Sequence, residues 1–209
     1  MNSTNEKRNF DLQSAFLTPV RLLGVGFSKM SSTRLNYWGE FLVDLALIAV
    51  LAFEGWRMVD RQPLVALSAV VLGLVIYSFV EYVFHRWLFH NGPAWFSDGH
   101  NQHHINPMGY DSLPFFLPAL ISLGLARVYM LVMPTGVALL VAASLTFGYV
   151  LYGLGHFAIH HVRFRHPLLR RWAALHHIHH YHPDRNFGVT TPLWDILLRT
   201  KYVRHSPAA

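Results

Sequence analysis

The sequence predicts an all-α integral membrane protein. Of its 209 residues, 53% are hydrophobic and only 13% are charged, whereas soluble domains average about 25% charged residues. The apolar residues gather in four stretches, each about as long as a membrane-spanning helix, and the histidines gather near the ends of two of them. Cysteine is absent, which excludes disulfides and thiolate metal sites. Any transition metal must therefore bind to nitrogen or oxygen.

Four transmembrane helices are expected, over about residues 37–56, 63–89, 114–133 and 134–160. A bilayer core of about 30 Å needs about 20 helical residues. The first stretch is the weakest because Glu40, Asp44 and Glu54 interrupt it. Residues 37–209 form one membrane-embedded domain after a cytoplasmic or interfacial arm, residues 1–36. A soluble helical protein is the alternative, but residues 64–80 carry no charge.

The basic residues predict the orientation. Most lysines and arginines lie before residue 35 or after residue 160, and four spans place both ends on the same side. The positive-inside rule makes that side cytoplasmic. Residues 90–113 and 161–209 would then form a cytoplasmic cap. The net charge of +6 indicates an anionic lipid surface as the partner, and no nucleic acid is expected.

Histidine is the outlier of the composition, with 15 residues, 14 of them between His85 and His182. Pro63 lies 22 residues before His85, and Pro134 lies 22 residues before His156. At 1.5 Å per residue each distance is about 33 Å, just over one bilayer core. Both helices therefore bring their first histidine to the cytoplasmic side at a similar depth. Two further clusters of histidines, which begin at His100 and His176, follow in the cytoplasmic segments.

Spacing within the clusters favours metal ligation. Histidines three or four residues apart share a helical face, as in the HxxHH motifs that begin at His100 and His176. His85 and His90 are five apart, about 140° round an α-helix. They either bind different metals or lie where the helix has ended. About ten ligands imply two ions, and imidazole suits Zn, Fe, Cu or Ni. Glu81 is expected to accept a hydrogen bond from a ligand imidazole.

The motifs EYVFHRWLFH, HNQHHINP and HHIHHYHPDRNFGVTTPLWD, with GHFAIHH between them, resemble those of the fatty acid hydroxylase/sterol desaturase superfamily, and most of all its fatty acid 2-hydroxylase branch. The resemblance covers about residues 77–200. It implies a di-metal centre of two iron ions, which zinc can replace in an isolated protein, with O2 as co-substrate. The ligands it implies are His85, His90, His100, His103, His104, His156, His160, His176, His179 and His180.

The resemblance also implies residues around the ligands. His161 and His177 flank the motifs, and Tyr152 matches an aromatic position of related hydroxylases. The next position is often aspartate in those relatives but is Gly153 here, which affects the surroundings of the metals and the choice of substrate. No catalytic residue beyond the metal ligands is expected. Relatives often carry a fused haem domain that this chain does not contain, so a separate electron-donor protein is expected.

The function predicted is therefore hydroxylation of a C–H bond in a fatty acyl chain or another membrane lipid. One alternative is a desaturase or hydroxylase of sterol or carotenoid-like lipids, and another is a non-redox zinc-dependent membrane enzyme. A zinc hydrolase would need a well-placed general base, but the sequence holds no HExxH motif. Histidines bunched at one end argue against a metal transporter or a haem electron carrier. A bacterial inner membrane is favoured over the endoplasmic reticulum.

Overall fold

The computed structural model describes residues 30–110 and 112–204, and all the regular structure in these ranges is helical. Most of the arm expected over residues 1–36 lies outside them. The elements are α2 (Arg34–Met58), α3 (Pro63–Val83), the π-helix η1 (Phe84–Phe89), α4 (Ala94–Ile105), α5 (Leu117–Tyr129), α6 (Thr135–His161), α7 (Pro167–Tyr181) and α8 (Leu193–Leu197). The all-α prediction is confirmed for this part of the chain.

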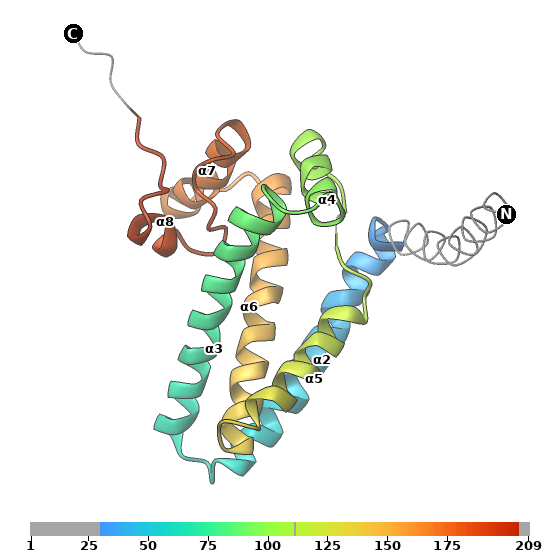
Figure 1. Cartoon of the computed structure of the whole chain (residues 1–209), viewed down its shortest axis with the longest axis vertical. Helices are drawn as coiled ribbons and strands as arrows, with labels where there is room; N and C mark the ends of the chain where they lie inside the picture. Colours follow the sequence, from blue (N-terminus) through green and yellow to red (C-terminus); the bar gives the residue numbers. More distant parts are fainter. Residues whose placement is uncertain (1–29, 111, 205–209) are drawn as a thin grey trace, which may run out of the picture.

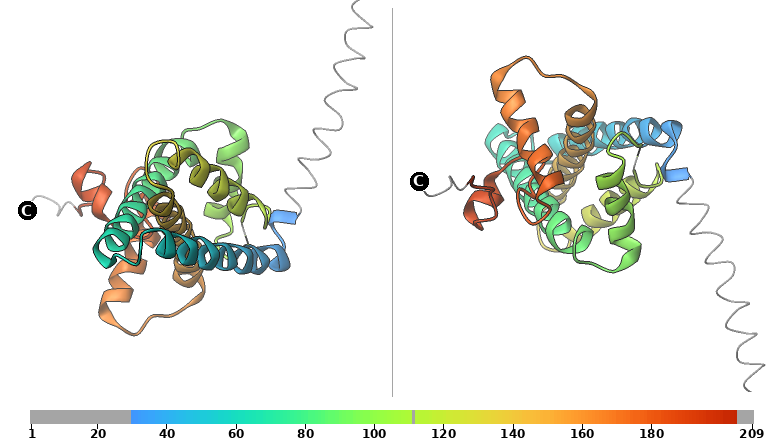
Figure 2. Two further views of the ribbon diagram at one scale, coloured as in Figure 1. Left: turned by 90° about the horizontal axis from the view of Figure 1, so that it is seen from below. Right: turned by 90° about the horizontal axis from the view of Figure 1, so that it is seen from above.

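Helix α6 is the central element, and it packs against α2, α3 and α5 (Figures 1 and 2). Small residues bring α3 and α6 close together. A Cβ added at Gly73 of α3 would lie 2.5 Å from the backbone oxygen of Val141 in α6. A Cβ at Gly148 of α6 would lie 2.5 Å from the Tyr77 ring. Both contacts require glycine because no other residue fits so near a neighbouring helix.

Two continuous helical segments are long and apolar enough to cross a membrane. These are Pro63–Phe89, with a mean hydropathy of 2.3, and Thr135–His161, with a mean hydropathy of 1.9. The most apolar part of the first segment is only 22% buried within the protein. A core helix of a soluble protein would be mostly covered, so this outer face has the composition expected of a surface that contacts lipid.

The two other expected spans differ from the prediction. Helix α2 has 25 residues and is longer than residues 37–56. Helix α5 has 13 residues, and therefore covers only part of residues 114–133. The chain leaves the helix at Met130 and turns through Met133 into Pro134, so about 20 Å of helix remains. Alone and upright, α5 is shorter than a bilayer core.

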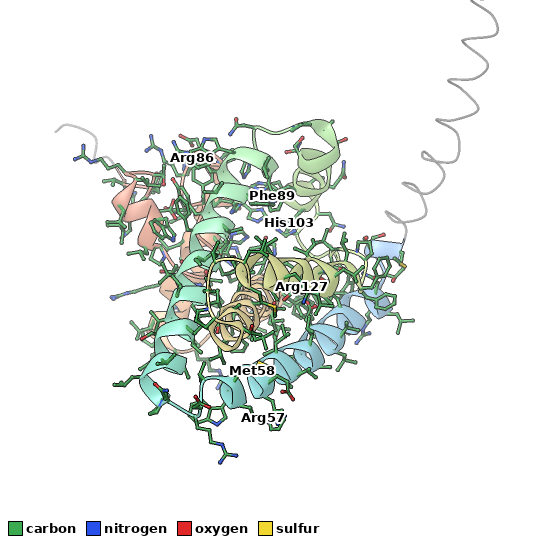
Figure 3. The ribbon with its side chains drawn as sticks, turned by 60° about the horizontal axis from the view of Figure 1, so that its bottom comes forward. Arg57, Met58, Arg86, Phe89, His103 and Arg127 are labelled. Atoms are coloured by element: carbon green, nitrogen blue, oxygen red, sulfur yellow. The ribbon has the colours of Figure 1, made fainter. Side chains whose placement is uncertain are left out.

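The histidine-bearing elements gather at one end of the bundle (Figure 1). Helices α4 and α7 lie there, beside the end of α6 and the π-helix that continues α3. Arg57 and Met58 lie at the opposite end from Arg86, Phe89 and His103 (Figure 3). At the histidine end, Asn36 joins the start of α2 to the segment before α5, because its side-chain NH2 donates to the Leu113 carbonyl at 2.7 Å.

Candidate metal centre

The ten predicted ligands form two groups of five. Within each group one ring nitrogen of every histidine lies within 4.8 Å of the others. The first group is His85, His90, His100, His104 and His179. The second group is His103, His156, His160, His176 and His180. No carboxylate belongs to either group among the residues that the structure describes.

The π-helix η1 explains how His85 and His90 reach the same group. Its hydrogen bonds run from residue i to i+5, so a turn holds more residues than in an α-helix and residues five apart lie closer together around the axis. His90 follows directly after the last η1 residue, and its ring stacks on that of His85 with centroids 5.2 Å apart. His85 and His90 therefore belong to one group, and the helix ends directly before His90, as the second of the two predicted alternatives has it.

Helices α4 and α7 each supply ligands to both groups. In α4, His100 and His104 belong to the first group and His103 to the second. In α7, His176 and His180 belong to the second group and His179 to the first. The last two histidines of an HxxHH motif are adjacent residues, and adjacent residues point about 100° apart on a helix. One of them can therefore face the first group while the other faces the second. The two groups therefore lie side by side between α4 and α7.

The rings of His85 and His179 each make a hydrogen bond through Nδ1, the nitrogen that faces away from the first group. These bonds fix the direction of the lone pair on Nε2. Nδ1 of His85 lies 2.5 Å from the Phe187 carbonyl oxygen, and Nδ1 of His179 lies 2.7 Å from the Arg185 carbonyl oxygen. A carbonyl oxygen only accepts, so both Nδ1 atoms carry the proton. In the neutral rings Nε2 then presents a lone pair to the first group.

The spacing of these nitrogens fits bound cations. In the first group Nε2 of His100 lies 3.1 Å from that of His85, and Nε2 of His90 lies 3.0 Å from that of His179. In the second group the Nε2 atoms of His156 and His176 are 2.9 Å apart. Two imidazoles at about 2.1 Å from one metal and at right angles have nitrogens about 3.0 Å apart. The donor set therefore fits one transition-metal ion in each group.

Burial keeps the cap histidines neutral. Burial, followed by the repulsion of the neighbouring imidazoles, lowers the pKa of His104 to about 4. Burial also lowers the pKa of His179 and of His180 to about 3. The pKa of His176 lies well below its usual value for the same reason. These rings are uncharged at neutral pH and can donate to a metal.

The prediction for Glu81 is wrong, because its carboxylate bonds to a loop instead of an imidazole. It accepts hydrogen bonds from the backbone N–H groups of Val189 and Thr190 at 2.6 and 3.0 Å, and from the Thr190 hydroxyl. Asp195 binds the other half of the same loop, accepting from the N–H groups of Phe187 and Gly188. Glu81 thus holds the segment that follows Phe187, whose own carbonyl contacts His85.

Three other predicted residues lie around the second group. The Tyr152 ring is nearly parallel to that of His156, with centroids 5.6 Å apart. His161 instead turns away, since its Nδ1 donates to the Phe157 carbonyl at 2.9 Å. His177 is exposed, with its ring centroid 5.7 Å from that of His160.

Gly153 has a steric reason to be glycine in this protein. A Cβ at this position would lie 2.7 Å from the Phe41 ring of α2. An aspartate here would therefore need the Phe41 ring or α2 to shift. Glycine at position 153 is thus explained by the close packing of α2 on α6.

Comparisons with known proteins agree with the motifs. A sequence model of the family described as "Fatty acid hydroxylase" matches residues 70–200. The chain is 28% identical over 106 residues to dihydroceramide fatty acyl 2-hydroxylase FAH2 of Arabidopsis thaliana, an alignment that covers 48% of this chain and 44% of that protein. It is 33% identical over 105 residues to fatty acid 2-hydroxylase of Homo sapiens, over 48% of this chain and 28% of that protein.

A solved structure shares the fold. The one described as "Full length scs7p (only hydroxylase domain visible)" superimposes with a TM-score of 0.70 at 26% sequence identity, over 87% of this chain and 71% of that chain. The alignments with the two curated relatives span less than half the length of either protein. The family match spans all ten histidines of the two groups.

Proposed function

The chain belongs to the fatty acid hydroxylase family, and on that premise we propose that it is a membrane-bound di-iron oxygenase. It hydroxylates a C–H bond of a fatty acyl chain or another lipid. The observation that carries this proposal is the pair of five-histidine groups at the end of two apolar helices. The 2-hydroxylases among the similar proteins favour an acyl chain as the substrate.

Each five-histidine group would hold one iron ion, and the ions would supply the activation of O2 and the oxidation of an unreactive C–H bond. The protein holds the imidazole lone pairs in place and excludes water. His85, His176 and His179 are at most 1% exposed. Hydroxylation converts R–H, O2, two electrons and two protons into R–OH and H2O. We propose a separate electron-donor protein as the source of the two electrons.

A groove between α3 and α6 suits an acyl chain. It has a volume of about 310 Å³, and its lining is mostly apolar. Its lining residues come from α3, including Val71, Val75 and Tyr77, and from α6, with Gly148 and Leu151. Thr190 and Thr191 of the loop after α7 also line it. The same loop contains Phe187, which contacts His85. An acyl chain in this groove would thus reach the loop that borders the first group.

The cap is proposed to face the cytoplasm. In this arrangement α2, α3, α5 and α6 are the four spans, and the short α5 crosses only together with the turns at its ends. The exposed arginines at the histidine end, including Arg163, Arg165 and Arg170, agree with the positive-inside rule. A bacterial inner membrane stays a prediction, and the curated relatives named above come from a plant and a human.

The test is anaerobic expression with added iron, followed by metal quantification and lipid analysis. We expect about two metal ions per chain and a hydroxylated lipid in expressing cells. His103→Ala and His179→Ala each remove a ligand from a different group, so each should lose one site and reduce the product at least 100-fold. His166→Ala is the control, because His166 is exposed and belongs to neither group.

The outcomes separate the alternatives. A new double bond in place of a hydroxyl would identify a desaturase. Two zinc ions that iron cannot replace, with no oxidised lipid, would identify a zinc-dependent enzyme. If the His103→Ala and His179→Ala proteins keep both metals and the full lipid product, the metal centre itself is wrong.

A further inference from the structure

The peptide unit between Phe187 and Gly188 lies between a carboxylate and a ligand histidine. Its carbonyl oxygen accepts from Nδ1 of His85 at 2.5 Å. Its N–H, that of Gly188, donates to Oδ2 of Asp195 at 2.8 Å. The other oxygen of Asp195 accepts from the N–H of Phe187 at 2.9 Å. Asp195 is 1% exposed, so water does not compete for these bonds.

We propose that Asp195 is a positioning residue of the first group, which acts on His85 through this peptide. This inference rests on the proposed function, since it assumes a metal at that group. A negative charge at the N–H end of a peptide polarises the carbonyl at its other end, and hydrogen bonds in such a chain strengthen one another. The stronger bond to Nδ1–H makes Nε2 of His85 a better donor and holds the ring in place.

The surroundings of Asp195 fix its orientation. The Thr200 hydroxyl donates to Oδ1 of Asp195 at 2.7 Å, and the Tyr82 hydroxyl lies 3.0 Å from that of Thr200. Arg86 donates to the Tyr82 hydroxyl at 2.8 Å. Gly188 leaves no room for a side chain, since a Cβ would lie 2.1 Å from the Thr191 oxygen. These contacts link the loop to the helix that carries His85.

The same group contains an internal comparison. Nδ1 of His179 donates to the Arg185 carbonyl, and the N–H of that peptide unit, from Asn186, donates to the Thr200 carbonyl at 3.0 Å. This series of hydrogen bonds ends on a neutral carbonyl oxygen, whereas the series that starts at His85 ends on a carboxylate. Removing the charge of Asp195 should therefore affect His85 and leave the bond of His179 in place.

Glu81 provides a matched control on the same loop. It is also a buried carboxylate that accepts two backbone N–H groups, those of Val189 and Thr190. The peptide unit whose N–H belongs to Thr190 presents its carbonyl to the indole N–H of Trp172 at 2.6 Å. Glu81→Gln thus replaces a carboxyl group that bonds to the loop, without touching the peptide bonded to His85.

The experiment titrates the full-length protein in detergent with Co2+ alone, against a competing chelator. For Asp195→Asn we expect one site weakened by about 10- to 100-fold and the other within about threefold of wild type. Glu81→Gln should keep both affinities within about threefold, even if its thermal midpoint falls. His90→Ala identifies which binding step belongs to the first group.

A spectroscopic measurement separates this role from simple packing. In the Co2+-loaded protein, each ligand Nδ1–H gives a shifted, solvent-exchangeable proton resonance. Asp195→Asn should move one of these resonances or make it exchange faster. If Asp195→Asn does not fold, Asp195→Glu takes its place, because a carboxylate displaced by one methylene must change the same resonance.

The results distinguish this inference from the proposed function. Unchanged affinity and an unchanged resonance in the folded variant overturn the role of Asp195 alone. Equal weakening of both sites by Asp195→Asn and Glu81→Gln also overturns it, since the loop would then act only as packing. A wild-type protein that binds no Co2+ overturns the metal centre. Normal Co2+ binding without a lipid product overturns the proposed reaction but leaves Asp195 its role.

Discussion

His176 and His177 are neighbours in the sequence but lie in opposite environments. His176 is 1% exposed, and its Nε2 lies within 3.1 Å of those of His160 and His180. His177 is exposed and belongs to neither group. Adjacent helical residues point about 100° apart, which explains the difference.

This contrast gives a test at the scale of one residue. His176→Ala should lower the metal content from about two ions to about one per chain, because its group loses a buried ligand. His177→Ala should keep both ions. Metal analysis of the two purified proteins measures this directly, and equal metal loss in both variants would contradict the grouping.

The residue types of the site were predictable, but their hydrogen-bond partners were not. The histidine clusters could be identified from their spacing because only certain side chains bind metals, and the resemblance implied which ten histidines are the ligands. The partners of His85 and His179 are backbone carbonyls of Phe187 and Arg185, which every residue has and which no sequence pattern marks. Glu81 stands out in the sequence because it is charged in an apolar segment, which predicts a bond to an imidazole, whereas its bonds are to a distant loop.

At the scale of elements, the π-helix η1 is the feature that the sequence did not reveal. The 140° separation expected for His85 and His90 assumes α-helical geometry, and the π-helix reduces it because each turn holds more residues. The two HxxHH motifs did predict a shared face on α4 and α7. They could not show that one face serves two groups, because that depends on how the two helices are packed against each other.

The contact between α3 and α6 gives a test of the bundle. Gly73→Ala should lower the free energy of unfolding by about 1–3 kcal/mol, because the new methyl group would meet the Val141 backbone oxygen, which cannot move alone. Gly124→Ala is the matched control on α5, where a Cβ meets nothing within 4 Å. Thermal unfolding in detergent compares them, and equal stability of the two variants would contradict this close approach.

At the scale of the whole molecule, an apolar bundle carries a histidine cap at one end. Spacing from Pro63 and Pro134 predicted that His85 and His156 would reach the same end, and the elements that carry both groups gather there (Figure 1). The length of α5 was not predictable from hydropathy, because its apolar residues continue through the turn that ends the helix. Apolar composition indicates contact with lipid but does not determine where helical geometry stops.

The cap histidines make the stability of the metal-free protein depend on pH. In the unfolded chain a histidine has a pKa of about 6.5, whereas burial lowers the pKa of His104 to about 4 and those of His179 and His180 to about 3. Between these values the unfolded chain binds more protons than the folded one. Stability therefore falls as the pH drops from about 6.5 towards 4, and is constant with respect to these groups above about pH 7.5.

This dependence can be measured as the thermal midpoint of the metal-free protein in detergent at pH 8, 7, 6 and 5. We expect little change between pH 8 and 7 and a clear decrease between pH 6.5 and 5. His104→Gln removes one titrating ring, so its decrease should be smaller than that of wild type, whereas His166→Ala should follow wild type because His166 is exposed. Bound metal opposes protonation of the same nitrogens, and the loaded protein should therefore keep its midpoint to a lower pH. A wild-type midpoint that rises on acidification would contradict buried, neutral histidines in the cap.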